Sequence, residues 1–258
     1  MTPKFRRRCC RTLVLSSLWL IIFFPVNEWA ASPSIAFLVA AAIVSASYRW
    51  WKTSLCHFFT VRRFAAVIPG HLYRSGQISR FHIRRVLRRH RIRAVIDLTS
   101  ASPGDCHKRV ESAAITKAGI IGYRFPMRGN GTGELSMVAD AVTALHRHLV
   151  SEQPVLVHCA AGVQRTGHVL SAYLLLVAGA DPTAVYQYME RFGWEPSRSS
   201  KWPAQLNENM RALAEILVER RVIPSMPEYL PRLPSARPDG LKPWWLPSSH
   251  LISPVLGR

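Results

Sequence analysis

Acidic residues are scarce in this sequence, which has 15 Asp and Glu against 34 Lys and Arg and a formal net charge of +19. Such a shortage of acids favours anionic partners, for example acidic membrane surfaces, polyphosphates or nucleic acid. Cysteines are also few, because the chain has five, scattered and without CxxC spacing. No zinc site or disulfide framework follows from them, and no metal or other cofactor is expected.

One of the cysteines stands between two apolar segments. Residues 154–157 predict a buried strand and residues 166–178 an apolar helix. The stretch at their junction reads His158-Cys159-Ala160-Ala161-Gly162-Val163-Gln164-Arg165-Thr166-Gly167. A strand–loop–helix turn of this kind can bind an anion with its backbone N–H groups and the helix N-terminus. The same field favours the thiolate of Cys159, and the planar fork of Arg165 can hold two phosphate oxygens.

This stretch resembles the phosphate-binding loop of the cysteine-dependent protein tyrosine phosphatase superfamily, whose signature is His-Cys, five residues, then Arg and Ser or Thr. In having a glycine at position 162 and a compact chain length, the sequence resembles the dual-specificity branch of this superfamily. The resemblance implies that Cys159 is the nucleophile that forms a phosphocysteine, that Arg165 binds phosphate and the transition state, and that Thr166 assists breakdown of the intermediate. It implies a supporting role for His158. It also implies phosphate binding by Ala160, Ala161, Gly162, Val163, Gln164 and Arg165.

Strands and helices alternate around this loop, which indicates an α/β domain. Strands are predicted at 68–77, 94–98, 120–125 and 154–157. Helices are predicted at 80–90, capped by Ser79, and at 106–118, 134–150, 166–178, 182–192 and 207–220. The resemblance implies a dual-specificity phosphatase-like central sheet flanked by helices, in a phosphatase domain at 67–223.

Two apolar runs, Leu13–Ala31 and Ile35–Tyr48, precede this domain. Together they can form two short membrane spans, given roughly 20 residues per crossing. Basic residues lie outside the pair and the connecting loop carries only Glu28. The positive-inside rule therefore predicts a multi-pass membrane protein with a transmembrane hairpin and a cytoplasmic catalytic domain. A single anchor, a cleaved signal peptide and a soluble pair of helices are alternatives.

The remaining segments have distinct compositions. Residues 1–52 form the predicted membrane anchor, 53–66 an aromatic and basic juxtamembrane segment, and 224–258 a Pro-rich tail that is extended or disordered. The predicted helix at 80–90 has a strongly basic exposed side. That side is either a solvated face or a face that contacts anionic lipid.

The predicted general acid is the point where the pattern departs from the family. Many relatives carry Asp about three residues after the Pro at the end of the third strand, and here that position is Gly129. Two substitutes are open: Glu134, carried in by a loop that three glycines make mobile, and Asp105 from the preceding loop. Glu134 can equally have a structural role, because an acidic side chain in the first turn of a helix interacts favourably with the helix dipole. Without an acid, worth roughly 10²–10⁴-fold, substrates with good leaving groups are favoured.

The predicted function is a membrane-anchored phosphatase that hydrolyses phosphomonoesters through a phosphocysteine. Its predicted substrate is either a phosphoprotein or the headgroup of an anionic phospholipid. On phosphoproteins the enzyme would act with tyrosine specificity or with dual specificity. The membrane is an expected partner and nucleic acid is not. The alternative is a catalytically weak pseudophosphatase that binds phosphorylated partners, which is consistent with Gly129.

Overall fold

The structure of the protein is a computed structural model that describes residues 32–50, 61–100, 104–197 and 199–239. The chain divides into two compact units, Met1–Thr60 and Val61–Arg258.

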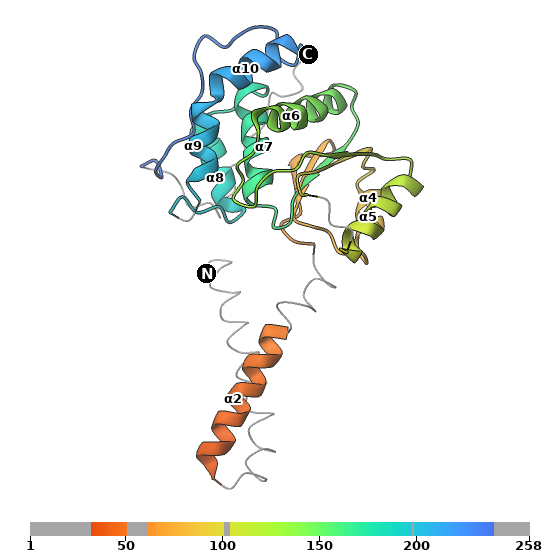
Figure 1. The fold of residues 1–258 in the computed structure, drawn as a ribbon, viewed down its shortest axis with the longest axis vertical. Helices are drawn as coiled ribbons and strands as arrows, with labels where there is room; N and C mark the ends of the chain where they lie inside the picture. The colour runs from red at the N-terminus through yellow and green to blue at the C-terminus, as the bar shows by residue number, and fades with distance from the viewer. Residues whose placement is uncertain (1–31, 51–60, 101–103, 198, 240–258) are drawn as a thin grey trace. The chain divides into compact units, whose positions relative to one another are not determined.

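In the first unit the structure describes helix α2, Pro33–Trp50 (Figure 1). Large apolar side chains on it are exposed, for example Phe37 and Leu38. Among the described helices it is the one that is long and apolar enough to cross a membrane, judged by length and composition. The first arm of the predicted hairpin, Leu13–Ala31, lies outside the described residues. Of the two predicted spans, the described residues therefore contain one apolar helix, in the place of the second.

A five-stranded sheet forms the centre of the second unit, in the order β1-β2-β5-β3-β4. The strands are β1 Ala65–Ile68, β2 Leu72–Ser75, β3 Ala94–Asp97, β4 Ile121–Arg124 and β5 Val155–His158. β1 is antiparallel to β2, and the other neighbours are parallel. β5 is central, so Val155 to Val157 are fully buried, as expected for a parallel strand covered on both faces.

Helices cover both faces of the sheet (Figure 1). On one face lie α4 Ile83–Arg89 and α5 Cys106–Lys117. The other layer consists of α6 Leu135–Val150, α7 Gln164–Leu176, α8 Pro182–Arg191, α9 Lys201–Glu208 and α10 Met210–Glu219. Each layer closes its own apolar core, the larger around α7 and the smaller around Ile83 and Leu87. The predicted α/β fold, with a central sheet flanked by helices, is confirmed.

Two local predictions were wrong, and one helix was not predicted. The strand predicted at 68–77 is a hairpin, in which β1 and β2 are joined by a turn with Gly70 at φ +83°. The Ser79 hydroxyl does not cap a helix, because the carbonyl oxygen of Ser79 accepts from Ile83 N and α4 begins only at Ile83. Helix α9 was not predicted, since the chain offered a Trp-Pro pair and little apolar periodicity at its start.

The first half of the Pro-rich tail packs onto the domain. Leu233 is buried, and its backbone N–H and C=O both bond to the side-chain amide of Asn207, at 2.9 Å each. Arg237 pairs with Glu190 on α8 at 3.1 Å. Residues 224–239 are therefore extended but held in place, and 240–258 lie outside the described residues.

Candidate active site

The predicted phosphate loop links the end of the central strand to a helix. β5 ends at His158 and α7 begins at Gln164. The Cys159 side chain is buried, and Gly162 N donates to its Sγ at 3.2 Å. No side chain caps the described N-terminus of α7, so its first N–H groups stay available to an anion. The strand, loop and helix lie where the sequence predicted them, with the helix starting two residues earlier.

Two glycines allow the loop to pack against the backbone after β2. Gly162 has φ +68°, and a Cβ there would lie 2.5 Å from Gly76 N and 2.7 Å from the carbonyl carbon of Ser75. A Cβ on Gly76 would lie 3.0 Å from the carbonyl carbon of Ala161. Only a residue without Cβ fits at 162, because the contact is with backbone that cannot move aside.

Two arginines brace the loop from outside. Arg74 is fully buried, donates from Nη2 to Gly162 O at 2.6 Å, and stacks 3.9 Å above the ring of Phe192. Arg63 donates from Nη1 to Ala161 O at 2.8 Å. Partial burial, with Arg62 and Arg74 nearby, lowers the pKa of Arg63 from its usual value. These bonds occupy carbonyl oxygens of the loop and leave its N–H groups for an anion.

Neither brace was identified from the sequence. Arg63 was placed in the juxtamembrane segment and Arg74 was treated as an ordinary strand residue. The available signal was an arginine inside a predicted strand, two residues before Gly76, since a charge that becomes buried needs a specific partner.

Arg165 and Thr166, for which the resemblance implied catalytic roles, lie in the first turn of α7. Arg165 is half-buried and donates from Nε to Arg128 O at 3.1 Å, which fixes one side of its guanidinium. Thr166 is buried, and its hydroxyl has no hydrogen-bond partner among the described residues. The hydroxyl is therefore available for the role predicted at the thiolate. The Gln164 side chain turns to α9, where Trp202 Nε1 donates to its Oε1 at 2.8 Å.

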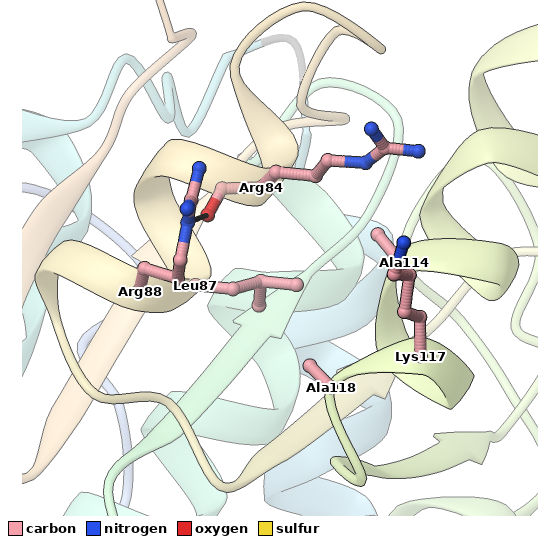
Figure 2. A pocket seen from close by; sticks show the side chains of 6 residues that line it. All are labelled: Arg84, Leu87, Arg88, Ala114, Lys117 and Ala118. Carbon is pink, nitrogen blue, oxygen red and sulfur yellow. Dashed lines mark hydrogen bonds between the residues drawn. The ribbon is translucent and has the colours of Figure 1, made fainter.

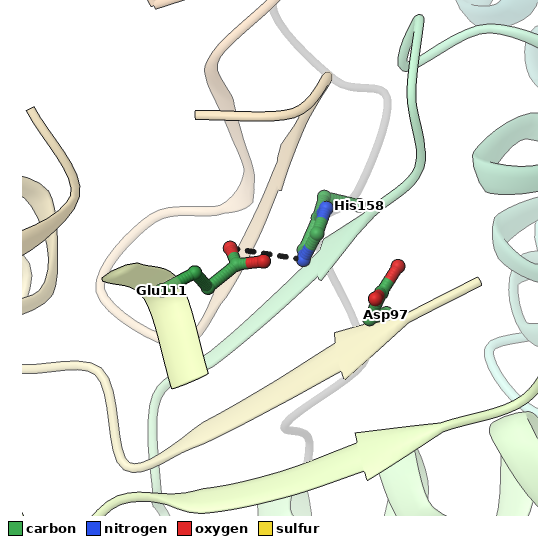
Figure 3. Close-up of side chains that lie close together, drawn as sticks. All are labelled: Asp97, Glu111 and His158. Atoms are coloured by element: carbon green, nitrogen blue, oxygen red, sulfur yellow. Dashed lines mark ion pairs between the residues drawn. The ribbon is translucent and has the colours of Figure 1, made fainter. Parts of the chain in front are cut away.

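His158, the predicted supporting residue, is held by a carboxylate from the other face of the sheet. Its Nε2 lies 3.2 Å from Glu111 Oε1, and both side chains are buried (Figure 3). Gln77 donates to the second oxygen of Glu111 at 3.1 Å. His158 directly precedes Cys159, so this contact from α5 positions the strand end that carries the nucleophile.

Asp97 completes a cluster of three groups that could ligate a metal ion. The ligand atoms of Asp97, Glu111 and His158 lie within 4.8 Å of one another (Figure 3). Arg124 Nε donates to Asp97 at 3.1 Å, however, and Thr99 donates to it from N and Oγ1. Since a cation would have to compete with Arg124, these partners favour a hydrogen-bonded network.

The two substitute acids are placed differently from a catalytic acid. Asp105 caps α5, accepting from His107 N at 2.8 Å and Lys108 N at 3.3 Å. Glu134 is exposed and occupies the N-cap position of α6. In the described part of the chain, no hydrogen bond or ion pair joins either carboxylate to the phosphate loop. A Cβ on Gly129, in contrast, would lie 3.5 Å from Arg165 Nη2.

The loop that carries Gly129 is bonded to two helices. Gln205 of α9 both donates to Gly133 O at 2.9 Å and accepts from Gly133 N at 3.1 Å. His168 of α7 donates from Nδ1 to Gly131 O at 2.8 Å, and burial lowers the pKa of His168 to about 4. These contacts are not those of a mobile loop that would carry Glu134 into the site, as the three glycines had suggested.

Residues 76–180 match the family model described as "polymorphic toxin system, DSP-PTPase phosphatase". This segment contains Gly76, the loop that carries Gly129, and the whole phosphate loop with its braced backbone. It belongs to the cysteine-dependent protein tyrosine phosphatase superfamily, in the dual-specificity-like branch. The domain is a cysteine-dependent phosphatase, as predicted.

Three solved structures are similar to the chain. A DUF442 protein from Shewanella putrefaciens CN-32 is 25% identical, with 60% of this chain and 94% of that chain covered and a TM-score of 0.49. The core catalytic domain of the PP-IP phosphatase SIW14 from S. cerevisiae is 20% identical, with 62% and 94% covered and a TM-score of 0.49. TpbA from P. aeruginosa is 20% identical, with 61% and 96% covered and a TM-score of 0.47. No curated protein matches the chain.

Proposed function

We propose that the domain hydrolyses phosphomonoesters in two steps through Cys159. The thiolate attacks phosphorus and the ester oxygen leaves, which gives a phosphocysteine. Arg165 and the loop N–H groups stabilise the charge that spreads over the phosphoryl oxygens. Water then attacks the phosphocysteine and releases inorganic phosphate, while Thr166 assists the departure of the thiolate. The hydrogen bonds from Arg63 and Arg74 support this proposal, because they engage carbonyl oxygens of the loop and leave its N–H groups for the phosphoryl oxygens.

Among the residues that the structure describes, no carboxylate forms an ion pair with Arg165, and this observation carries the proposal for the substrate class. Gly129 occupies the position next to the guanidinium, Asp105 caps α5, and Glu134 is exposed at the start of α6. Without an acid the leaving oxygen departs unprotonated. The phenol of tyrosine, with a pKa near 10, then leaves more easily than an aliphatic alcohol. We therefore place a phosphotyrosine-bearing protein first among the substrates.

A phospholipid headgroup phosphate is the second candidate, favoured by the apolar helix α2. The side chains of the loop itself, Ala160, Ala161, Val163 and Gln164, are uncharged, which supports a substrate with a single phosphate rather than a polyphosphorylated headgroup. We further propose that α2 belongs to a membrane anchor within 1–52 and that the catalytic domain is cytoplasmic. Resistance of the full chain to alkaline extraction from membranes would test the anchor.

Phosphate release by the detergent-solubilised full chain tests the function, with Cys159→Ser as control. The protein receives a phosphotyrosine peptide in one arm and vesicles that contain phosphatidylglycerophosphate in the other. Cys159-dependent release from the peptide, with little from the vesicles, is the expected result. Release from the vesicles alone would replace phosphotyrosine with the lipid phosphate. Binding of the peptide without release from either substrate would overturn the enzyme proposal in favour of a phosphate-binding pseudophosphatase.

A further inference from the structure

Helix α4 and its flanking residues carry an unusual density of positive charge. Residues 80–93 contain no acid and seven arginines, Arg80, Arg84, Arg85, Arg88, Arg89, Arg91 and Arg93. All seven are exposed, and none forms an ion pair with a residue that the structure describes.

The fold does not require these arginines. The buried side of α4 consists of Ile83, Val86 and Leu87, which close the smaller core. The exposed side sets Arg84 above Arg88 and Arg85 above Arg89, four residues apart, where like charges repel and destabilise a helix. A sequence under selection for stability alone would place acids among them, so the charge favours a partner that supplies the missing anions.

The charges surround a hollow between the two helices on this side of the sheet. A surface pocket of about 320 Å³ is lined by Arg84, Leu87, Arg88, Ala114, Lys117 and Ala118. Leu87 points from α4 toward the alanines of α5, so apolar atoms form the floor (Figure 2). Arg84, Arg88 and Lys117 supply the polar rim (Figure 2).

A second hollow lies at the other end of the same charged segment. It measures about 460 Å³, and Arg89, Arg91 and Arg93 line it together with Tyr73, His90 and other residues. Glu152 is the acidic residue in its wall. Two basic hollows in succession suit a partner that presents several phosphates over an area, rather than one small anion.

We propose that this surface, formed by α4, residues 91–93 and the Lys117 end of α5, docks onto an anionic membrane. We name it the α4–α5 basic face. Headgroup phosphates bind Arg84, Arg88 and Lys117, the basic rim that faces the membrane. A lipid surface fits better than nucleic acid as the occupant, because helix α2 of the same chain is long and apolar enough to cross a membrane and would keep the domain beside one. The proposal concerns the docking of the domain and does not rest on the proposed substrate.

Retention of the domain on vesicles after removal of the N-terminal unit tests this proposal. The full chain carries an inserted protease site within residues 51–60 and is reconstituted with vesicles of phosphatidylcholine alone or with 30% phosphatidylglycerol. After cleavage the vesicles are pelleted, and hydrolysis of a soluble aryl phosphate confirms that the domain in each fraction is folded. We expect retention on the phosphatidylglycerol vesicles only, and release in high salt, which screens exposed charges.

Two charge-matched triple variants identify the surface. Arg84→Gln, Arg88→Gln and Lys117→Gln remove the rim of the pocket, and at about fivefold per base they should weaken retention about 100-fold. Arg147→Gln, Arg211→Gln and Arg232→Gln remove the same charge from exposed residues outside this face and should retain the domain. Equal loss in both variants would reduce the effect to net charge, and equal retention on both kinds of vesicle would show that the domain does not need an anionic lipid. Either result overturns the proposal, whatever the phosphatase assay gives.

Discussion

The phosphate loop, residues 159–165, and the loop opposite it, residues 127–134, are held in place in a similar way but carry different chemical groups. Both are fixed by side chains from elsewhere in the chain: Arg63 and Arg74 hold the first, and His168 and Gln205 hold the second. The first also carries Cys159, the proposed nucleophile, and Arg165, the proposed phosphate-binding residue. The second brings Gly129 next to that arginine and contributes no carboxylate. A loop held by two side chains thus approaches Arg165 without placing a carboxylate at position 129.

Breaking the phosphate loop should have the largest effect. We expect Gly162→Ala to lower kcat/KM for an aryl phosphate about 10²–10³-fold, because its Cβ would clash with the Gly76 backbone and displace the N–H groups that bind the transition state. Initial rates on p-nitrophenyl phosphate would measure this.

Gly179→Ala is the matched control. Gly179 also has positive φ, at +61°, but a Cβ there meets nothing within 4 Å. We expect a stability loss of about 1 kcal/mol and an unchanged rate. A wild-type rate in the Gly162 variant would contradict the backbone contact as the reason for glycine.

A carboxylate at position 129 should give the 127–134 loop the acidic group that it lacks there. We expect Gly129→Asp to raise the rate on an alkyl phosphate about 10–10²-fold, since a carboxyl beside Arg165 could protonate the leaving oxygen. The rate on an aryl phosphate should change much less. Gly129→Asn has the same size without a transferable proton, and an equal gain in that variant would show that protonation is not the cause.

His168 lies on α7, the helix after the phosphate loop, and donates a hydrogen bond to Gly131 in the 127–134 loop. Its titration should make the stability of the domain depend on pH. Its pKa is about 4 in the folded protein, because burial disfavours the imidazolium, against 6.5 when exposed. The unfolded chain therefore takes up a proton that the folded chain refuses, and stability falls as pH falls from about 6.5 towards 4. We expect a loss of about 2 kcal/mol from this group between pH 7 and pH 5, measured by urea unfolding. The His168→Gln variant, which can still donate to Gly131, should lack this component; an identical pH profile would rule it out.

The smallest effect should come from Gln205, which bonds Gly133 twice. We expect Gln205→Ala to cost about 1–2 kcal/mol of unfolding free energy and to lower the aryl phosphatase rate only a few-fold. Asn209→Ala is a suitable control, because the Asn209 side chain donates to Gln205 O at the end of α9 and, among the described residues, makes no hydrogen bond to the 127–134 loop. A larger rate loss in the Asn209 variant would mean that the 127–134 loop does not depend on Gln205.

The strand, loop and helix around Cys159 could be predicted from the sequence, whereas the residues that hold this loop in place could not. The run from His158 to Thr166 was readable because each residue type has a local reason, and the flanking strand and helix followed from their apolar pattern. The braces were not readable, since Arg74 and Gly162 are 88 residues apart and meet only after β2 and β5 pair. Likewise, the partners of Asp105 and Glu134 depend on where α5 and α6 begin, which sequence patterns place only to within a few residues.

The domain uses chain beyond both of its predicted limits, 67 and 223. At the N-terminal side Arg62 O accepts from Gly76 N at 2.8 Å and Arg63 holds the catalytic loop; at the C-terminal side Leu233 fills the larger core. A fragment excised at the predicted limits would thus lose the hydrogen bond from Arg63 to the phosphate loop and the Leu233 side chain of the larger core. A fragment that keeps residues 61–239 should accordingly unfold at a higher urea concentration than one that is cut at 67 and 223.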